Sequence, residues 1–458
     1  MNAFRSTTHR IPHRGKAFGA LAAVVALTGA ATATASPDPL HHGSRHEPTN
    51  VILLIGDGMG DSEITAARNY EVGANGRLNL DRLQSTGAYT TYSVQKGTNT
   101  PDYVTDSAAS GTGWATGTKS YNGAISVDTN GNPKATVLEL AKKAGYRTGD
   151  VTTAEIQDAT PAVLGSHVTS RDCKGPSATT AKCPTDALEN GGKGSISEQL
   201  VKTRPDVLLG GGRSYLDEKI TAGKYAGQTV LDRARTSGYF VATNEQQLRK
   251  APKNKPVLGS FAPNNMDLEW TGPKPTHDNT PATRCAVNAK RDAAQPHLST
   301  MADVAINRLD TLSKGAKKGK GFFLQIEGAS IDKEDHAANP CGQIGENVEF
   351  DKAVGKALAY QQKHKNTLVI VTGDHGHTSQ IVEAGSKTAG VTATLTTADN
   401  APMTISYATA AKDGDSQEHT GTQIRVAATG PEASRVEGVT NQTDLFTTMT
   451  TAMSIGRR

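Results

Sequence analysis

The sequence predicts an α/β fold, a three-layer sandwich in which helices flank a central and mostly parallel sheet. Short runs rich in Val, Ile and Leu alternate along the chain with helical patterns, which is typical of layered α/β proteins. The run 51–55 is apolar throughout, as expected for a strand buried on both faces of a parallel sheet. The predicted strands are 51–55, 149–152, 207–209, 322–326 and 368–372.

The segments between these runs complete the prediction. One helix is expected over 138–144, ending at Gly145, and another over 346–363. The stretch 250–295 is rich in Pro, Asn and Lys and predicts a long surface excursion, while 314–320 predicts a solvated Gly-Lys loop. With 458 residues, 36% of them hydrophobic, and 47 glycines, the chain has an ordinary globular composition. A single α/β domain with insertions reaches this length.

The N-terminus predicts export. Residues 1–36 combine a basic start, an apolar run over 17–31 and a small-residue exit, the pattern of a cleaved signal peptide. The alternative, a membrane anchor, is disfavoured because the run is too short to span a bilayer comfortably. Residues 37–49 predict an extended, proline-containing arm, which leaves 50–458 as a single domain with surface insertions.

Charge and aromatic content exclude a nucleic-acid partner. Removing the four basic residues of the signal leaves 45 of the 49 Lys and Arg against 45 acidic residues, so the mature chain is neutral. Aromatic residues make up 5% of the chain, too few for a base-stacking platform. No membrane span is expected once the signal is removed.

Four cysteines follow the signal. In an exported protein an even number predicts two disulfides, with three possible pairings. Nearest-neighbour pairing, Cys173 with Cys183 and Cys285 with Cys341, would close the smaller loops. A zinc cluster is the alternative, and the absence of a C-x-x-C motif disfavours it.

Acidic residues stand where three predicted strands end. Asp57 follows the first strand, Glu327 ends another, and Asp374 with His375 follows a third. Ligands of open α/β sheets bind outside these carboxyl ends. A single acid there is as often a helix N-cap. Three of them in one crevice would repel one another unless they were neutralised, so the pattern predicts bound metal cations.

Further candidate ligands lie downstream. Asp332 and His336 are four residues apart, so a helix would present both on one face; a plain i,i+4 surface contact is the alternative. His419 precedes another predicted strand, 422–427, and would otherwise be a solvated loop histidine. Mixed His/Asp ligation suits zinc and all-oxygen ligation suits magnesium, and the chain offers both.

Ser107 is the candidate nucleophile. The small residues after it could open a helix, whose free N–H groups and dipole would favour an alkoxide and an anionic substrate. The alternative is an ordinary N-cap serine. The sequence lacks the G-x-S-x-G of serine esterases and the H-E-x-x-H of zinc proteases. It also lacks a complete dinucleotide fingerprint and a P-loop.

Seven segments together closely resemble the bacterial alkaline phosphatases of the two-zinc, one-magnesium type. The resemblance implies hydrolysis of phosphate monoesters with broad alcohol specificity through a phosphoserine intermediate. It also implies an alkaline phosphatase-like fold, a secreted or periplasmic location and a homodimer. The segments are NVILLIGDGMGDS (50–62), VTDSAAS (104–110), TAEIQDATP (153–161), HVTSR (167–171), QIEGASIDKEDHAANPCGQ (325–343), TGDHGH (372–377) and DSQEHTG (415–421).

The resemblance also implies a role for each matching residue. Ser107 would be phosphorylated, and Arg171 would bind two phosphate oxygens. The first zinc would be bound by Asp332, His336 and His419, the second by Asp57, Asp374 and His375, and magnesium by Asp57, Thr160 and Glu327. Around these ligands would lie Asp158, Lys333, Asp106 and His377. The nearest-neighbour disulfides are implied as well.

Some of these residues have plainer interpretations from the sequence alone. Thr160 before Pro161 predicts an N-cap, Arg171 predicts an exposed ion pair with Asp172, and Lys333 predicts a solvated side chain. Gly373 and Gly376 replace alanines that are common at these places, which predicts a looser loop.

Two rival functions are weighed. One is another activity of the same superfamily, a phosphodiesterase or a sulfatase; Arg171 together with a magnesium site favours a dianionic monoester instead. The other is a non-catalytic exported protein that binds metal or phosphate, which would leave Ser107 idle.

Overall fold

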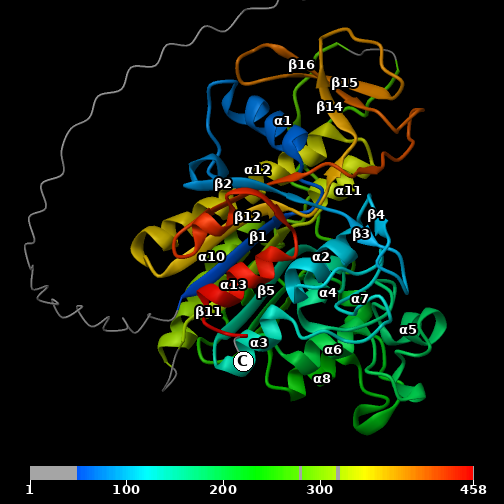
Figure 1. Ribbon diagram of the computed structural model, residues 1–458, viewed down its shortest axis with the longest axis vertical. Coiled ribbons are helices and arrows are strands. Elements are labelled where there is room, and N and C mark those ends of the chain that lie inside the picture. The colour runs from blue at the N-terminus through cyan, green and yellow to red at the C-terminus, as the bar shows by residue number, and fades with distance from the viewer. Residues whose placement is uncertain (1–48, 278–280, 316–319, 457–458) are drawn as a thin grey trace, which may run out of the picture. The chain divides into compact units, whose positions relative to one another are not determined.

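A ten-stranded sheet forms the centre of the computed structural model, which describes residues 49–277, 281–315 and 320–456 (Figure 1). Of these ten strands only β18 runs antiparallel to its neighbours, so the predicted mostly parallel sheet is confirmed. In spatial order the strands are β19 (Gly438–Asn441), β2 (Ser85–Thr90), β18 (Ile424–Thr429), β12 (Thr367–Gly373), β1 (Asn50–Gly56), β11 (Phe322–Gly328), β5 (Arg147–Glu155), β6 (Val207–Gly211), β8 (Val257–Ser260) and β7 (Phe240–Ala242).

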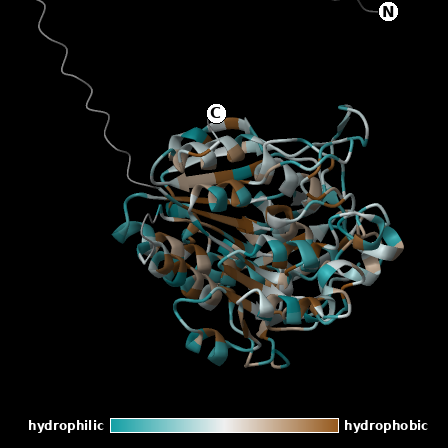
Figure 2. Cartoon of the chain, turned by 90° about the horizontal axis from the view of Figure 1, so that it is seen from below, coloured by the Kyte–Doolittle hydropathy of each residue, from teal (hydrophilic) through white to brown (hydrophobic). Residues whose placement is uncertain are grey.

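The apolar runs are strands because both of their faces are covered. All seven residues of β1 are buried. Val51 and Leu53 pack into the core on one face of the sheet, and Ile52 and Leu54 into the core on the other. Figure 2 shows these hydrophobic strands inside a more hydrophilic shell of helices. Because both faces of β1 are buried, its sequence does not alternate polar and apolar residues.

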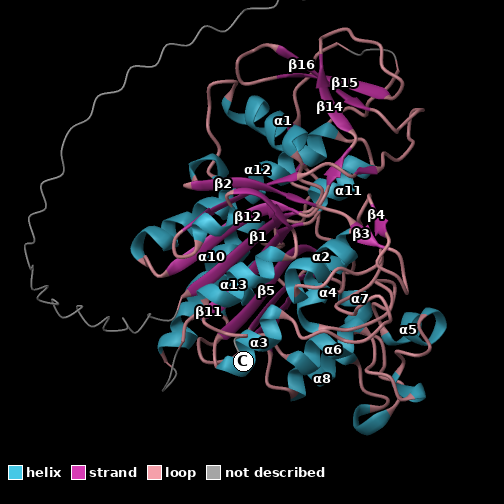
Figure 3. Cartoon of the chain, viewed as in Figure 1, coloured by secondary structure: helices cyan, strands magenta, loops and turns pink. Residues whose placement is uncertain are grey.

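Helices form the outer two layers (Figure 3). On one face of the sheet, the helices that contribute to its core are α2 (Ser107–Thr116), α3 (Val137–Ala144), α4 (Ala159–Gly165), α6 (Ile196–Thr203), α7 (Arg213–Leu216), α8 (Val230–Thr236) and α13 (Asp444–Ala452). On the other face they are α1 (Asp61–Val72), α9 (Glu245–Lys250), α10 (Leu298–Lys314), α11 (Ser330–His336) and α12 (Pro340–Lys363).

Smaller sheets extend this framework. The strands β14 (Ser379–Val382), β16 (Pro402–Tyr407) and β15 (Val391–Thr396) form an antiparallel sheet whose core includes residues of α1 and α12. The ladder of β13 (Gly376–His377) and β17 (His419–Thr420) pairs His377 directly with His419. The other two-stranded ladders are β3 (Ser93–Val94) with β4 (Pro101–Asp102) and β9 (Trp270–Thr271) with β10 (Ala286–Val287).

Helix ends follow local capping. Thr136 and Glu139 form a capping box at the start of α3, and Gly145 ends that helix with a φ of 94°, as predicted. α12 begins at Pro340, earlier than the predicted 346, because Asn339 caps it and a proline suits the first helical turn.

The structure corrects the prediction for 250–295 and does not cover those for the N-terminus and for part of the Gly-Lys loop. The stretch 250–295 is not wholly a surface excursion, since it contains β8, a buried strand of the central sheet. Its backbone pairs with β6 and β7, and this pairing outweighs the polar residues that flank it. The predicted signal peptide and nearly all of the arm lie outside the described residues, as do residues 316–319 of the predicted Gly-Lys loop.

Both disulfides have nearest-neighbour connectivity, Cys173–Cys183 and Cys285–Cys341, so this pairing is confirmed. They pin two irregular segments, one directly after Arg171 and one against the start of α12. Among the described residues, none of the helices combines the length and the apolar character needed to cross a bilayer.

Glu346 of α12 gives a pH-dependent prediction. It is buried and accepts a hydrogen bond from the Glu269 amide at 2.8 Å. Burial, with the charges of nearby carboxylates, raises the pKa of Glu346 from 4.5 to about 8. Because the folded pKa is the higher one, its contribution to stability is complete below about pH 4.5 and is lost as pH rises towards 8.

Glu346→Gln should therefore flatten the loss of stability with rising pH. Above pH ~8 we expect the variant to be more stable than the parent by roughly 1–4 kcal/mol, with little difference below pH ~4.5. Urea unfolding across this range measures the effect, and Glu383→Gln, at an exposed glutamate, is the control. A difference that does not vary with pH would contradict the prediction.

Candidate active site

Four adjacent parallel strands bring the candidate residues to one edge of the sheet. The spatial order is β12, β1, β11 and β5, and Gly56 of β1 pairs with Gly373 on one side and Gly328 on the other. Asp57 and Asp374 directly follow the paired glycines Gly56 and Gly373, so the two acidic residues lie side by side where these strands end. Glu327 pairs with Ile55 and with Thr152. The strand-end carboxylates converge as the sequence predicted.

Asp57, Asp374 and His375 form a first buried group, cluster A. One ligand atom from each lies within 4.8 Å of the others. The His375 Nε2 is 3.4 Å from Asp57 Oδ1 and 3.3 Å from Asp374 Oδ2. The Gly58 amide donates to Asp374 Oδ1 at 2.8 Å, while Oδ2 has no hydrogen-bond partner among the described residues. Burial and the neighbouring charge of Asp57 raise the pKa of Asp374 well above its usual range.

Asp332, His336, His377 and His419 form a second group, cluster B, which also meets the 4.8 Å criterion. α11 supplies Asp332 and His336 from one face, as the i,i+4 spacing predicted, and the β13–β17 ladder supplies the other two. The Nε2 atoms of His336 and His419 are 3.0 Å apart.

The outer nitrogens of these imidazoles are held by the backbone. His336 Nδ1 lies 2.7 Å from the Gln417 carbonyl oxygen, and His419 Nδ1 lies 3.0 Å from that of Thr105. A hydrogen bond of this kind makes Nδ1 the protonated nitrogen and leaves Nε2 as an electron-pair donor, as is usual for metal-binding histidines. In both residues Nε2 faces Asp332 Oδ1, at 3.5 and 3.3 Å.

His377 lies inside cluster B, closer than the surrounding position that the resemblance implied. Its Nε2–H donates to Asp332 Oδ1 at 2.7 Å. Burial lowers the pKa of His377 to about 4, so the ring is neutral and carries one N–H. With that hydrogen on Nε2, His377 orients the Asp332 carboxylate.

Asp57, Thr160 and Glu327 offer an all-oxygen set. Glu327 is buried and accepts a hydrogen bond from Thr152 Oγ1. Burial, followed by the charge of Asp57, raises the pKa of Glu327 well above its usual range. The interpretation of Thr160 as an N-cap is wrong: Asp158 caps α4, and Thr160 lies within the first turn with a buried Oγ1 that has no hydrogen-bond partner in the described part of the chain.

Ser107 is the first residue of α2, and Asp106 is its N-cap. The serine side chain is almost fully buried. Its Oγ donates to Asp57 Oδ1 at 3.2 Å and lies 3.3 Å from His375 Nε2, so the hydroxyl is in direct contact with cluster A. The positive end of the α2 dipole also lies at this hydroxyl.

Arg171 is held by two carboxylates, and neither is the adjacent Asp172. Its Nη1 donates to Asp106 Oδ2 at 3.2 Å and its Nη2 to Asp158 Oδ1 at 3.1 Å. The predicted surface pair is wrong because Asp172 binds Lys182 instead. Asp106 therefore links the helix that begins with Ser107 to the guanidinium, since its Oδ1 caps α2 through Ala109.

Lys333 is not a freely solvated side chain either. Its Nζ donates to Asp158 Oδ2 at 2.9 Å. Burial opposes the charged form, but the carboxylates around it, Asp158 foremost, raise the pKa of Lys333 above its usual range. Lys333 thus remains an ammonium ion beside the site.

These residues fit divalent cations. Three buried carboxylates, Asp57, Asp374 and Glu327, lie together, and the pKa values of Asp374 and Glu327 are raised by burial and by the charge of Asp57. Such a cluster needs a positive charge to remain ionised. The unpartnered oxygens of Asp374 and Thr160 are free to accept one. Mixed His/carboxylate donors in clusters A and B suit zinc, and the all-oxygen set suits magnesium.

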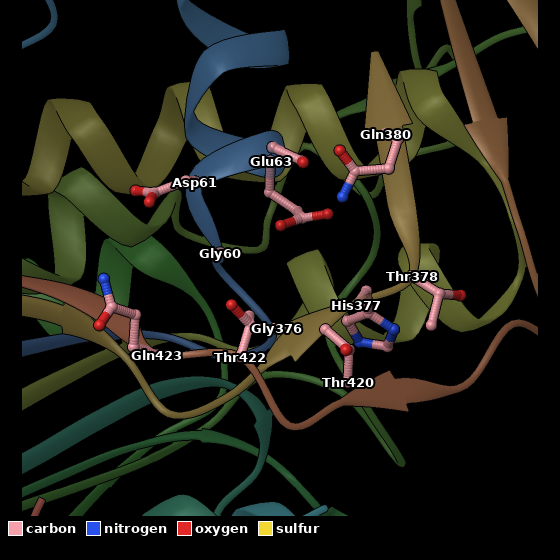
Figure 4. A pocket seen from close by; sticks show the side chains of 11 residues that line it. Gly60, Asp61, Glu63, Gly376, His377, Thr378, Gln380, Thr420, Thr422 and Gln423 are labelled. Carbon is pink, nitrogen blue, oxygen red and sulfur yellow. The ribbon is translucent and has the colours of Figure 1, made fainter. Parts of the chain in front are cut away.

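A polar pocket of about 500 Å³ lies beside cluster B. Figure 4 shows His377 and Thr420 on one side of it, and Glu63 and Gln380 on the other. Burial raises the pKa of Glu63 to about 7, and the Ser379 hydroxyl donates to its carboxylate. Cluster B therefore borders a polar cavity at His377.

The looser loop at Gly373 stays a prediction, but the space beside this glycine is filled. A Cβ at this position would lie 2.5 Å from the Met59 carbonyl oxygen, so backbone fills the space of the absent methyl group. A Cβ at Gly376 would meet only the ends of side chains, the nearest being Thr422 Cγ2 at 3.1 Å.

Sequence reasoning missed Lys174, which contacts Asp158 and Glu155 beside Arg171. A lysine in a polar loop ordinarily indicates solvated surface, and the contact arises only because the chain turns back after Cys173. The one indication in the sequence was that Lys174 lies three residues after Arg171.

The fold and the site together define a metal-dependent hydrolase. Its parallel sheet presents carboxylate and imidazole groups beside a serine at a helix N-terminus. The sequence profile described as Alkaline phosphatase matches residues 48–414 and 390–455. The chain belongs to the alkaline phosphatase family, and it is a phosphomonoesterase with metal cofactors.

Individual relatives agree with this assignment. The chain is 55% identical over 413 residues to the alkaline phosphatase of Escherichia fergusonii, covering 89% of this chain and 86% of the relative. It is 49% identical over 453 residues to the streptomycin-6-phosphate phosphatase of Streptomyces griseus, covering 97% and 98%. The alkaline phosphatase structure from the Antarctic bacterium TAB5 has a TM-score of 0.65 at 25% identity, covering 90% and 100%. A variant of that enzyme has Mg bound in its M3 site.

Proposed function

We propose that Ser107 is the nucleophile of this phosphomonoesterase and forms a phosphoserine intermediate. The observation that carries the proposal is the position of its Oγ, at the start of α2 and 3.2 Å from Asp57 in cluster A. Oγ attacks phosphorus as the ester P–O bond breaks, and the alcohol leaves. Water then attacks the phosphoserine, the Oγ–P bond breaks, and inorganic phosphate is released.

The metal ligands are proposed from the two clusters and the oxygen set. One zinc would be held by Asp332, His336 and His419, a second by Asp57, Asp374 and His375, and magnesium by Asp57, Thr160 and Glu327. When bound, these ions supply positive charge to the attacking and leaving oxygens. His377 orients Asp332 through its 2.7 Å hydrogen bond, while Thr105 and Gln417 orient two of the histidines.

Arg171 is proposed to bind two non-bridging oxygens of the phosphoryl group. A planar guanidinium presents paired N–H donors at the spacing of such oxygens. Asp106 and Asp158 fix its plane from two directions, and Lys333 neutralises Asp158 from its other oxygen. Because recognition is directed at the phosphate, many alcohols would be accepted.

Arg171→Ala should raise the KM for p-nitrophenyl phosphate by roughly ten- to a hundredfold, because the charge-assisted bonds to the substrate are lost. The variant should also lose part of its preference for monoesters over diesters, since a diester has fewer charged oxygens. Steady-state kinetics on p-nitrophenyl phosphate and bis-p-nitrophenyl phosphate measure both effects. Lys182→Met, in the same disulfide-bonded segment, is the control. An unchanged KM would show that Arg171 does not bind the phosphoryl group of the substrate.

Three further proposals concern the whole protein. We propose that residues 1–36 are removed on export to the periplasm or medium, which accords with two disulfides in the mature chain. Residues 50–458 would form the single catalytic domain, because one central sheet contains strands from β1 to β19. The mature protein would be a homodimer, as family resemblance implies, with the arm at 37–49 contacting the partner. Its mass in solution with and without the arm tests the last point.

A further inference from the structure

A third cation, Lys174, contacts the carboxylate that holds Arg171. Its Nζ is 2.6 Å from Glu155 Oε2 and 3.3 Å from Asp158 Oδ1. The side chain is 20% exposed, and its ammonium lies 6.0 Å from the centre of the Tyr215 ring. Lys174 is therefore a largely buried charge near the proposed phosphate-binding guanidinium, with a carboxylate on either side.

The position of Lys174 is fixed by its backbone. The amide and the hydroxyl of Ser197 both donate to the Lys174 carbonyl oxygen, at 3.0 and 2.8 Å. The preceding residue, Cys173, is tied by the disulfide to Cys183 and accepts from the Ile196 amide at 2.9 Å. The start of α6 thus holds this segment, so the ammonium reaches Asp158 from a rigid base.

Lys174 and Arg171 share a single oxygen of Asp158. Oδ1 lies 3.1 Å from Arg171 Nη2 and 3.3 Å from Lys174 Nζ, whereas Oδ2 is bound by Lys333 at 2.9 Å. Burial acts to raise the pKa of Asp158, but its three cationic neighbours outweigh burial and hold that pKa well below its usual range. Asp158 is therefore a carboxylate whose charge is divided among three partners.

This sharing affects how strongly Asp158 retains the guanidinium. Three carboxylates, Asp106, Asp158 and Glu155, face three cations in this group. Without the ammonium of Lys174, three negative charges would face two positive ones, and Arg171 would be the one cation left at Asp158 Oδ1, beside the Ala159 amide that donates to the same oxygen at 3.1 Å. A guanidinium more fully neutralised by its own protein attracts a dianionic phosphoryl group less strongly.

We propose that Lys174 is a positioning residue for phosphate recognition: by sharing Asp158 Oδ1 it weakens the hold of that carboxylate on Arg171 and leaves the guanidinium free to bind the phosphoryl oxygens. The inference rests on the proposed role of Arg171 and adds to it a residue that acts through Asp158 without touching the substrate. Lys174 thereby sets the affinity for substrate and for the phosphate product together.

Lys174→Met tests this role. It should raise the KM for p-nitrophenyl phosphate and the inhibition constant of inorganic phosphate together, each by about three- to tenfold, with no comparable fall in kcat. The increase should shrink at high ionic strength, because salt screens the remaining charges. Lys174→Arg, which keeps the charge, should recover most of the affinity, and Lys182→Met should change neither constant.

A double variant separates failure of this inference from failure of the proposed function. If Lys174 acts through Arg171, Lys174→Met should have no further effect on KM in an Arg171→Ala background. An undiminished effect in the Arg171→Ala background would overturn the inference. The inference would also be overturned if a folded Lys174→Met protein kept a normal KM and a normal inhibition constant for phosphate while Arg171→Ala bound phosphate poorly. If Arg171→Ala itself left the KM unchanged, the proposed function would fail first. Should Lys174→Met not fold, Lys174→Gln provides the same comparison.

Discussion

Ser107→Ala should lower the turnover of p-nitrophenyl phosphate by roughly 10³-fold or more and abolish the phosphoenzyme. The substitution removes the only atom through which this side chain can form a bond to phosphorus, while Asp57, 3.2 Å away, keeps its other contacts. Any residual rate would come from water attacking a phosphoryl group still bound by Arg171 and the metal ions. Steady-state rates, together with acid-quenched labelling by a ³²P-phosphate ester, measure both effects.

A matched control lies one turn further along the same helix. The Ser110 hydroxyl donates to the Asp374 carbonyl oxygen at 2.9 Å. Ser110→Ala should therefore still form the phosphoenzyme, even if its rate falls because the Asp374 backbone is less well held. Zinc content measured by mass spectrometry should remain unchanged in Ser107→Ala. Full turnover in a metal-loaded Ser107→Ala protein would disprove the nucleophile assignment.

The central strands could be predicted because burial on both faces leaves a direct record in composition. β1, β11 and β12 are rich in buried apolar residues, and each carries its acid at or just beyond its carboxyl end. β8 escaped prediction because its four residues follow a lysine- and proline-rich stretch, and pairing with β6 decides its structure. The start of α12 was missed because Pro, Cys and Gly in its first turn obscure the helical pattern.

The site could be predicted as far as residue type and strand position determine it. Asp57 and Asp374 were identified by their strand positions and Asp332 by its helical spacing to His336, and all three lie in clusters A and B. The connections between these residues could not be predicted, since they depend on loops that fold back on one another. Asp106 joins the Ser107 helix to Arg171, a contact between residues 65 positions apart in the chain. The same kind of long-range contact made an apparently solvated Lys333 into a partner of Asp158.

Removing the metal ions should abolish activity and destabilise the fold. Without cations, the buried carboxylates of Asp57, Asp374 and Glu327 repel one another in a site from which water is largely excluded, and Ser107 loses the charge that would stabilise its alkoxide. Dialysis against a chelator should lower turnover by at least about 10³-fold and lower the melting temperature.

Reconstitution should distinguish the sites by the chemistry of their donors. Zinc should restore most of the activity lost on chelation, because clusters A and B offer imidazole and carboxylate groups together. Magnesium alone should restore little, yet it should increase the rate of the zinc-loaded protein through the all-oxygen set. Thr160→Val, which removes only an unpartnered hydroxyl, should abolish that magnesium effect while leaving the response to zinc. Undiminished turnover in protein shown by elemental analysis to be free of metal would rule out the mechanism.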